Sequence, residues 1–213
     1  MGEATAPGLR ERKKQRTRTT LIDAAIELCL RQGFERTTVD QIAAMADVSP
    51  RTFSRYFATK NAVATAMIDD AIEIAAAELT RQPADISHLE ALFRAYLSMY
   101  RKTKTAPGAG LTSERLMATI RIVMTAPVLQ HTVAEFRPHA ANVALAKRMG
   151  VGLDDRRLKL VAGLWATIIM CALADLSDPA TDWHSIAVDD VVSRAERTYA
   201  EFIDVTSSLH QRV

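Results

Sequence analysis

The stretch Asp47–Lys60, DVSPRTFSRYFATK, combines a clear helix start with two very different faces. Ser49 is a favourable N-cap residue, and Pro50 suits the first helical position because an N–H there would be unsatisfied anyway. Phe53 and Phe57 are four residues apart, so they would share one buried face of the helix. The remaining faces carry polar side chains, namely Arg51, Thr52, Ser54, Arg55 and Tyr56. A helix with this polar surface is suited to lie against something negatively charged.

A second short helix, at about residues 39–46, is predicted just before this stretch, with Thr37 or Thr38 as its cap. Two short helices joined by a tight turn are typical of a helix-turn-helix motif, whose second helix enters the DNA major groove. Arginine can bridge O6 and N7 of guanine, and Ser or Thr can contact bases or phosphates. Lys60 and the free N–H groups at the start of the next helix are suited to a phosphate. On spacing alone, a helical hairpin with a solvated polar face stays an open alternative.

The N-terminal part of the chain is basic. The segment Arg10–Arg18, RERKKQRTR, contains six basic residues and one acid. Residues 1–60 contain 11 Lys or Arg and 7 Asp or Glu, whereas the net charge of all 213 residues is only +2. We therefore expect residues 1–16 to form a flexible basic arm that follows phosphates or reaches a minor groove, and only the front of the chain to meet a polyanion.

The whole sequence predicts an all-α protein. Its hydrophobic content of 48% is sufficient for a buried core, and apolar residues recur at helical rather than alternating spacing. Pro138 should kink or split one helix. We expect a helix-turn-helix domain of three helices at residues 17–60 and a helical body at 61–213. The expected helices lie at approximately residues 17–32, 39–46, 49–57, 61–80, 87–103, 113–125, 128–149, 154–176 and 185–209.

Nothing in the sequence predicts export or membrane insertion. The first residues are polar and basic, without the apolar run of a signal peptide. The longest apolar stretch, Leu160–Ala174, is shorter than the roughly 18 residues that span a bilayer. Cys29 and Cys171 lie far apart within helical patterns, and we expect both to be small buried hydrophobic residues. The expectation is a cytoplasmic protein with no membrane association, no metal and no cofactor.

A helical enzyme should show a reactive group of residues, and none is visible. No two of the five histidines are spaced four apart, and the chain has no His-Glu-x-x-His, glycine-rich phosphate loop or Gly-x-Ser-x-Gly. Adjacent acidic residues on a helix point in different directions, so these pairs are expected to cap helices or lie at the surface. The pairs are Asp69-Asp70, Asp154-Asp155 and Asp189-Asp190. We therefore expect no catalytic residues.

The segment Thr19–Val63, TTLIDAAIELCLRQGFERTTVDQIAAMADVSPRTFSRYFATKNAV, closely resembles the N-terminal domain of the TetR family of bacterial one-component transcriptional regulators. The matching motifs are AA-x-x-L-x-x-x-x-GF, T-T-V-x-x-I-A, D-V-S and T-F-x-x-Y-F-x-x-K. The rest of the chain resembles the family only in length, helix count and layout. Arg51 stands where a small residue is frequent and Ser54 where an aromatic is frequent, and these departures concern base preference.

The resemblance implies roles for individual residues. Thr38 would contact a backbone phosphate at the start of the second helix, and Arg51 and Thr52 would lie at the major groove. Further phosphate contacts would come from Tyr56 and Lys60. The complete set of expected DNA-binding residues is Thr38, Ser49, Pro50, Arg51, Thr52, Ser54, Arg55, Tyr56 and Lys60. The expected partner is a double-stranded DNA operator.

The resemblance also implies a homodimer, built from the last two long helices of each subunit as a four-helix bundle. The predicted helix at 154–176 is apolar on nearly all sides, more than its own body is expected to cover. The candidate interface residues are Leu158, Val161, Leu164, Ile168, Val192, Tyr199 and Phe202. A two-fold dimer predicts a palindromic operator with half-sites roughly 34–36 Å, or a near multiple, apart. A monomer with this helix as its core is the alternative.

Finally, the resemblance implies that the helical body binds a small-molecule effector. Methionines adapt to irregular ligands, and a Tyr or Trp can supply a polar contact within an apolar pocket. The candidate cavity residues are Phe93, Tyr96, Met99, Tyr100, Leu116, Met117, Ile120, Met124, Trp165 and Met170. No cluster of charges stands out at plausible pocket positions, so we expect an apolar or aromatic effector that relieves repression. The alternatives are an ordinary packed core, an activator or ligand-independent regulator of the same fold, and a helical protein that only binds a small molecule.

Overall fold

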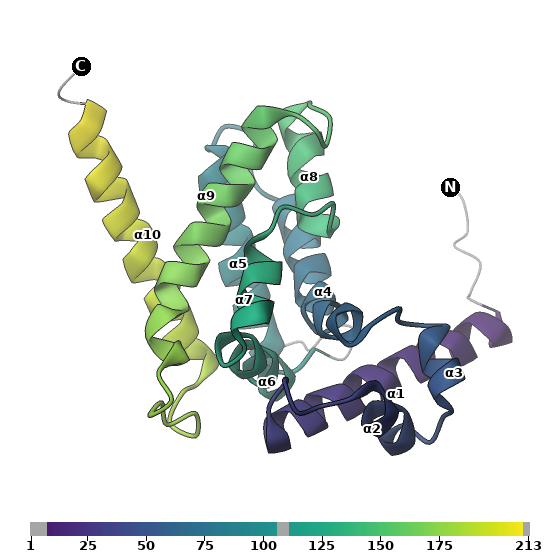
Figure 1. Cartoon of the computed structure of the whole chain (residues 1–213). Coiled ribbons are helices and arrows are strands. Elements are labelled where there is room, and N and C mark those ends of the chain that lie inside the picture. Colours follow the sequence, from purple (N-terminus) through teal and green to yellow (C-terminus); the bar gives the residue numbers. More distant parts are fainter. Residues whose placement is uncertain (1–7, 106–110, 211–213) are drawn as a thin grey trace. The chain divides into compact units, whose positions relative to one another are not determined.

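The computed structural model describes residues 8–105 and 111–210, and this part of the chain is all-α, as predicted (Figure 1). It contains ten α-helices, a short 3₁₀ segment η2 (Ala174–Ser177) and no β-strand. The helices are α1 (Leu9–Gln32), α2 (Val39–Met45), α3 (Pro50–Ser54), α4 (Lys60–Leu79), α5 (His88–Thr105), α6 (Ser113–Met124), α7 (Pro127–Ala134), α8 (Ala140–Met149), α9 (Arg156–Leu173) and α10 (Val188–His210). One more helix is present than expected, because the predicted helix at 128–149 is split into α7 and α8.

Proline causes this split. Helix α7 ends before Glu135, whose backbone is extended (φ −67°, ψ 136°). Pro138 has no N–H to continue a helix, and it disfavours helical backbone in the residue before it. The chain resumes as α8 only after His139, whose side chain caps the new helix. The short segment between the two helices is therefore irregular, and it forms part of the candidate site described below.

The chain divides into two compact units, Met1–Met67 and Ile68–Val213. The boundary lies seven residues later than the predicted one at 60/61, because the first two turns of α4 belong to the first unit. Their inward-facing residues, Val63, Ala64 and Met67, are buried. Helix α4 is unbroken from Lys60 to Leu79, so one helix contributes residues to both units.

The first unit has the core that the sequence predicts. Helix α2 packs against α1 and α3, and Ile42 and Phe53 are almost fully buried. The Phe53 and Phe57 ring centroids lie 5.8 Å apart, which places both rings on one apolar face. Helix α3 is shorter than the expected 49–57, because the N–H groups of Tyr56 and Phe57 both bind the carbonyl of Phe53 and tighten the last turn. Gly33 ends α1 with a φ of +83°, a backbone conformation that glycine adopts without strain.

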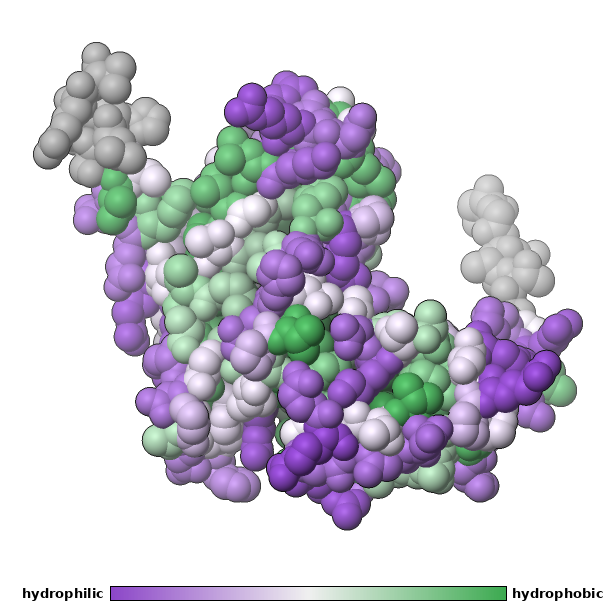
Figure 2. Space-filling view, viewed as in Figure 1, coloured by the Kyte–Doolittle hydropathy of each residue, from purple (hydrophilic) through white to green (hydrophobic). Residues whose placement is uncertain are grey.

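Helix α1 begins at Leu9 rather than at the predicted Thr17, so residues 9–16 of the expected flexible arm are helical. Residues 1–7 of that arm lie outside the described residues. Arg, Lys, Glu and Gln all have high helix propensity, and Glu11 and Lys14 form an ion pair of 3.9 Å one turn apart. Apolar periodicity does not detect such a segment, because every side chain from Arg10 to Arg16 is exposed. Figure 2 shows the resulting hydrophilic surface over the first turns of α1.

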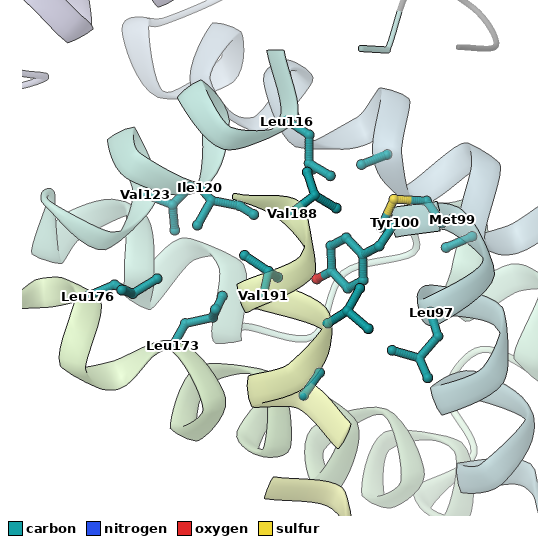
Figure 3. Packing of buried hydrophobic residues seen from close by; sticks show 14 of the residues in the cluster. Leu97, Met99, Tyr100, Leu116, Ile120, Val123, Leu173, Leu176, Val188 and Val191 are labelled. Atoms are coloured by element: carbon teal, nitrogen blue, oxygen red, sulfur yellow. The ribbon is translucent and has the colours of Figure 1, made fainter. Parts of the chain in front are cut away.

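Helix α9 is the central element of the second unit and packs against α5, α7, α8 and α10. The buried residues next to it form two clusters. In one of them, Met99 and Tyr100 of α5 meet Leu116 of α6 and Val188 and Val191 of α10 (Figure 3). In the other, α9 contributes Leu158, Ala162, Trp165 and Ile168. Together with η2, α9 forms the segment Arg156–Ser177, which by length and composition alone could cross a membrane. The apolar run considered in the sequence, Leu160–Ala174, is shorter than this segment.

Three of the seven candidate interface residues are core residues of their own subunit. Leu158, Ile168 and Val192 are 0%, 4% and 8% exposed, so the expectation that they form an interface is wrong. Helical periodicity shows that a side of α9 is apolar but not which side its own subunit covers. A different side of α9 is exposed and includes Leu160 and Leu164, and apolar surface along this helix is visible in Figure 2. Cys29 is buried as expected, whereas Cys171 is exposed.

Candidate functional site

Helix α3 presents a polar, cationic surface. Arg51, Ser54 and Arg55 are exposed, and Thr52 and Tyr56 are half-buried at the edges of the helix. Arg51 lies on α3 and Arg55 is its C-cap residue with helical backbone, so their spacing of four places both residues on the same side. Phe53 and Phe57 fix the opposite face in the core. The apolar face therefore determines which side chains point outward.

Side-chain hydroxyls fix where the two short helices begin. Ser49 Oγ accepts the Thr52 N–H (3.1 Å) and lies 3.0 Å from Thr52 Oγ1. Ser54 Oγ donates to the carbonyl of Pro50 (3.0 Å). At α2, Thr38 Oγ1 accepts the Gln41 N–H while Gln41 Oε1 accepts the Thr38 N–H, a reciprocal capping box. These residues position the helices, and Thr38, Ser49 and Ser54 are also exposed.

Lys60 has a structural role that the sequence did not reveal. Its Nζ donates to the main-chain oxygens of Phe34 (2.8 Å) and Glu35 (3.3 Å), and it lies 4.2 Å from the centroid of the Phe34 ring. These contacts fasten the start of α4 to the chain just after α1. The predicted phosphate contact would have to share the Lys60 ammonium group with these two carbonyls.

Basic side chains of α1 add to the positive charge of the first unit. The exposed ones are Arg10, Arg12, Lys13, Lys14 and Arg16. Arg18 is half-buried, and its guanidinium lies 5.7 Å from the centroid of the Phe57 ring, which joins α1 to the end of α3 by a cation–π contact. The cationic start of α1 and the polar face of α3 thus belong to the same compact unit.

The second unit contains a partly open cavity of about 160 Å³, lined by residues from α4 to α9. Eight of the ten predicted cavity residues line it, namely Tyr96, Met99, Tyr100, Leu116, Ile120, Met124, Trp165 and Met170. The other two do not. Phe93 stacks on Tyr199 of α10 with centroids 4.1 Å apart, and Met117 packs at the edge of the core cluster shown in Figure 3.

One end of the cavity is polar, contrary to the expectation that no charges stand out there. Its polar residues come from the segment that begins after α7 and ends in the first turn of α8, and they are Glu135, Arg137, His139 and Asn142. Arg137 Nη2 donates to Asp69 Oδ1 of α4 at 2.7 Å. Asn142 Nδ2 donates to the Arg137 carbonyl (2.8 Å), and the Asn142 N–H donates to His139 Nδ1 (3.3 Å). The only signal for this cluster in the sequence is the pattern Arg137-Pro138-His139 between two helices.

His139, Tyr96 and Tyr100, which line the cavity, are neutral near pH 7. Burial, and then the charge of Arg137, lower the pKa of His139 to about 4. Because its Nδ1 accepts a hydrogen bond, the neutral imidazole carries its proton on Nε2 and can donate it. Burial raises the pKa of Tyr96 to about 12 and also raises the pKa of Tyr100, so both phenols keep their protons. The cavity therefore offers neutral donors beside the Arg137 guanidinium and the Glu135 carboxylate.

The described residues contain no group of three or more His, Cys, Asp or Glu that could hold a metal ion. This part of the chain instead has two candidate sites. One is the cationic face of the helix-turn-helix, and the other is the mostly apolar cavity with one polar end.

Comparisons with known proteins agree with this geometry. The family model described as bacterial regulatory proteins, tetR family, matches residues 21–67. The chain is 39% identical over 155 residues to the HTH-type transcriptional regulator TcmR of Streptomyces glaucescens. The aligned region covers 70% of this chain and 67% of that protein. Among solved structures, a TetR-family regulator from Streptomyces coelicolor A3 matches with a TM-score of 0.50 at 21% identity. That match covers 92% of this chain and 97% of the other, and it supports the fold.

The neutral state of His139 predicts a pH-dependent stability. Between its folded pKa of about 4 and the ordinary value near 6.5, the unfolded chain binds a proton that the folded chain does not. Folded stability should therefore fall as pH decreases through this window, by on the order of 1–2 kcal/mol between about pH 7 and pH 5. The variant His139→Asn keeps an N-cap acceptor but cannot titrate, so it should lose this part of the pH dependence.

Urea unfolding followed by tryptophan fluorescence measures this effect, because Trp165 and Trp183 both lie in the second unit. The matched control is His184→Asn, which replaces an exposed histidine of the same unit. An unchanged pH profile in His139→Asn, or the same change in His184→Asn, would contradict the assignment.

Proposed function

Because the chain belongs to the TetR family of bacterial transcriptional regulators, we propose that it binds a palindromic operator as a homodimer and represses transcription until a small molecule occupies its cavity. The family is one of regulators and not of enzymes. The observation that carries the proposal is the exposed face of α3, with Arg51 on the helix and Arg55 at its C-cap both exposed, while Phe53 and Phe57 are buried. A protein with this role works in the cytoplasm, where the DNA is.

The proposed DNA-binding surface contains residues that contact bases and residues that contact phosphates. Arg51, in the first turn of α3, is placed to read a base edge, because N-terminal residues of a recognition helix contact bases. Arg55, Tyr56, Thr38 and the basic residues of α1 are suited to phosphates, which fix register without reading sequence. The helical start of α1 makes this contact more ordered than a flexible arm would.

The proposed dimer is supported by an unusual stripe on α9. After the exposed Arg156 and Arg157 of its first turn, exposed residues recur at three- and four-residue steps along one side of α9 and into η2. These residues are small or apolar except for one threonine, and they are Leu160, Gly163, Leu164, Thr167, Cys171 and Ala174. Leu160 is 62% exposed and Ile203 of α10 is 43% exposed. Two neighbouring helices with exposed apolar residues are suited to pack against a second copy of themselves.

Relief of repression would act through α4. Ile68, Ala71 and Ile72 of this helix line the cavity, and Lys60 fixes its start within the DNA-binding unit. An effector that fits better when α4 moves would shift the population toward a state with weaker DNA affinity. Its effect is limited by its differential affinity for the two states, typically about 1–3 kcal/mol, or roughly 5–150-fold.

The DNA assignment is tested with duplexes selected by the protein from a random pool, followed by fluorescence anisotropy. Replacement Arg51→Ala should weaken binding to the selected palindrome by about 1–3 kcal/mol, or roughly 5–150-fold, and leave binding to a random duplex nearly unchanged. Arg31→Ala removes the same charge from an exposed site at the end of α1 and is the control. An equal loss on both duplexes, or an equal effect of Arg31→Ala, would mean that Arg51 does not read bases.

The dimer assignment is tested by placing charges on the stripe. The double variant Leu160→Glu/Leu164→Glu should sediment as a folded monomer and lose affinity for the palindrome, because two buried charges would oppose the interface. Val143→Glu, at a 48% exposed position on α8, is the matched control and should stay dimeric. Cys171 lies on the stripe, so its reaction with a thiol reagent should be slow in the wild type and fast in the double variant. If the wild type sedimented as a monomer, the proposed dimer would be wrong.

A further inference from the structure

The polar end of the cavity is built from a fixed segment. Between Glu135 and Asn142, the Arg137 carbonyl accepts the Asn142 amide at 2.8 Å and His139 Nδ1 accepts the Asn142 N–H at 3.3 Å. Asn142 is only 6% exposed. Pro138 restricts the backbone between them. These two hydrogen bonds and the proline restrict the segment, as a preorganised binding site requires.

This end of the cavity offers mainly hydrogen-bond donors. Arg137 carries five N–H groups, and its hydrogen bond to Asp69 is made by one nitrogen, Nη2. Neutral His139 can donate from Nε2. The phenols of Tyr96 and Tyr100, which line the cavity elsewhere along its wall, also keep their protons. Glu135 also lines this end, but it is exposed and its carboxylate lies 3.1 Å from His131. A molecule that fits here needs an acceptor oxygen at one end and an apolar body.

The same arginine holds α4. Asp69 and Asp70 are neighbours on that helix and point in different directions, and each meets an arginine from a different element. Arg137, between α7 and α8, lies 2.7 Å from Asp69, and Arg115 of α6 lies 3.5 Å from Asp70. Both elements also line the cavity. Helix α4 is thus held at adjacent residues by two parts of the cavity wall.

We propose that the effector is an apolar or aromatic molecule ending in an acceptor oxygen, and that this oxygen competes with Asp69 for Arg137 and so frees α4. This inference rests on the proposed function, since it names the chemistry and the switch of the same effector site. Arg137 acts as a specificity-determining residue for the ligand and as a positioning residue for α4. In this proposal the Asp69 carboxylate accepts the Arg137 hydrogen bond that the acceptor group of the ligand would take.

The ligand class is tested with toluene, benzamide and benzoate, three single-ring probes that suit a cavity of about 160 Å³. Binding is followed by Trp165 fluorescence and by calorimetry. The wild type should bind a probe with an acceptor oxygen on the order of tenfold more tightly than toluene, and Arg137→Met should lose this preference while still binding toluene. Benzamide and benzoate separate a neutral carbonyl from a carboxylate.

The competition is tested with Asp69→Asn, which leaves Arg137 in place but weakens its partner. This variant should bind the acceptor probes several-fold more tightly and the selected operator several-fold more weakly, and a merely structural role would not produce opposite changes. Asp175→Asn removes a different ion pair of the same unit, with Arg194, and should change neither. A double-mutant cycle of Asp69→Asn and Arg137→Met should be non-additive for operator binding.

The outcomes separate the two proposals. If toluene binds in the cavity without any preference for an acceptor oxygen, or if Asp69→Asn weakens both kinds of binding, this inference is overturned and the effector site stands. If no probe binds in the cavity and the operator complex is insensitive to all three, the effector site of the proposed function fails as well. Circular dichroism of each variant excludes loss of fold as the cause.

Discussion

The structure depends on α4 being one unbroken helix. Its first residue, Lys60, is fixed to the carbonyls of Phe34 and Glu35, and its later residues Ile68, Ala71 and Ile72 form a wall of the cavity. The twenty residues of α4 contain neither Pro nor Gly, so the helix lacks these two usual causes of a sharp kink. One wall of the cavity and the helices of the first unit are therefore joined by a continuous helix.

Helix α9 shows how one sequence pattern can serve two purposes. It is apolar nearly all round, and a helix of that kind must be covered on several sides. Its own subunit covers the side with Leu158, Trp165 and Ile168, while Leu160 and Leu164 stay exposed. This second side is removed from water only by contact with another molecule. Such burial stabilises the complex by about 25 cal/mol per Å² of apolar surface. The proposed dimer thus follows from the surface that folding leaves uncovered.

Local signals in the sequence predicted the first unit well and the second unit only partly. Ser49 and Thr38 cap the helices that were expected, because capping and apolar spacing act over three or four residues. The early start of α1 was missed because charged helix formers leave no apolar period. Lys60 bonds to a carbonyl 26 residues away and Arg137 to a carboxylate 68 residues away, and no local pattern encodes such distances. The polar end of the cavity was missed for that reason.

The exposure of the Asp69–Arg137 pair suits it to a switch. Its two side chains are 31% and 26% exposed, so the pair is screened by water and contributes on the order of 1 kcal/mol. Breaking a fully buried pair would cost about 3–5 kcal/mol, more than most effectors supply as differential binding energy. A pair of intermediate exposure can hold α4 in the free protein and still be displaced by a ligand oxygen that replaces the lost carboxylate. In this proposal the ligand oxygen that displaces Asp69 also accepts from Arg137, so the half-buried guanidinium keeps an acceptor.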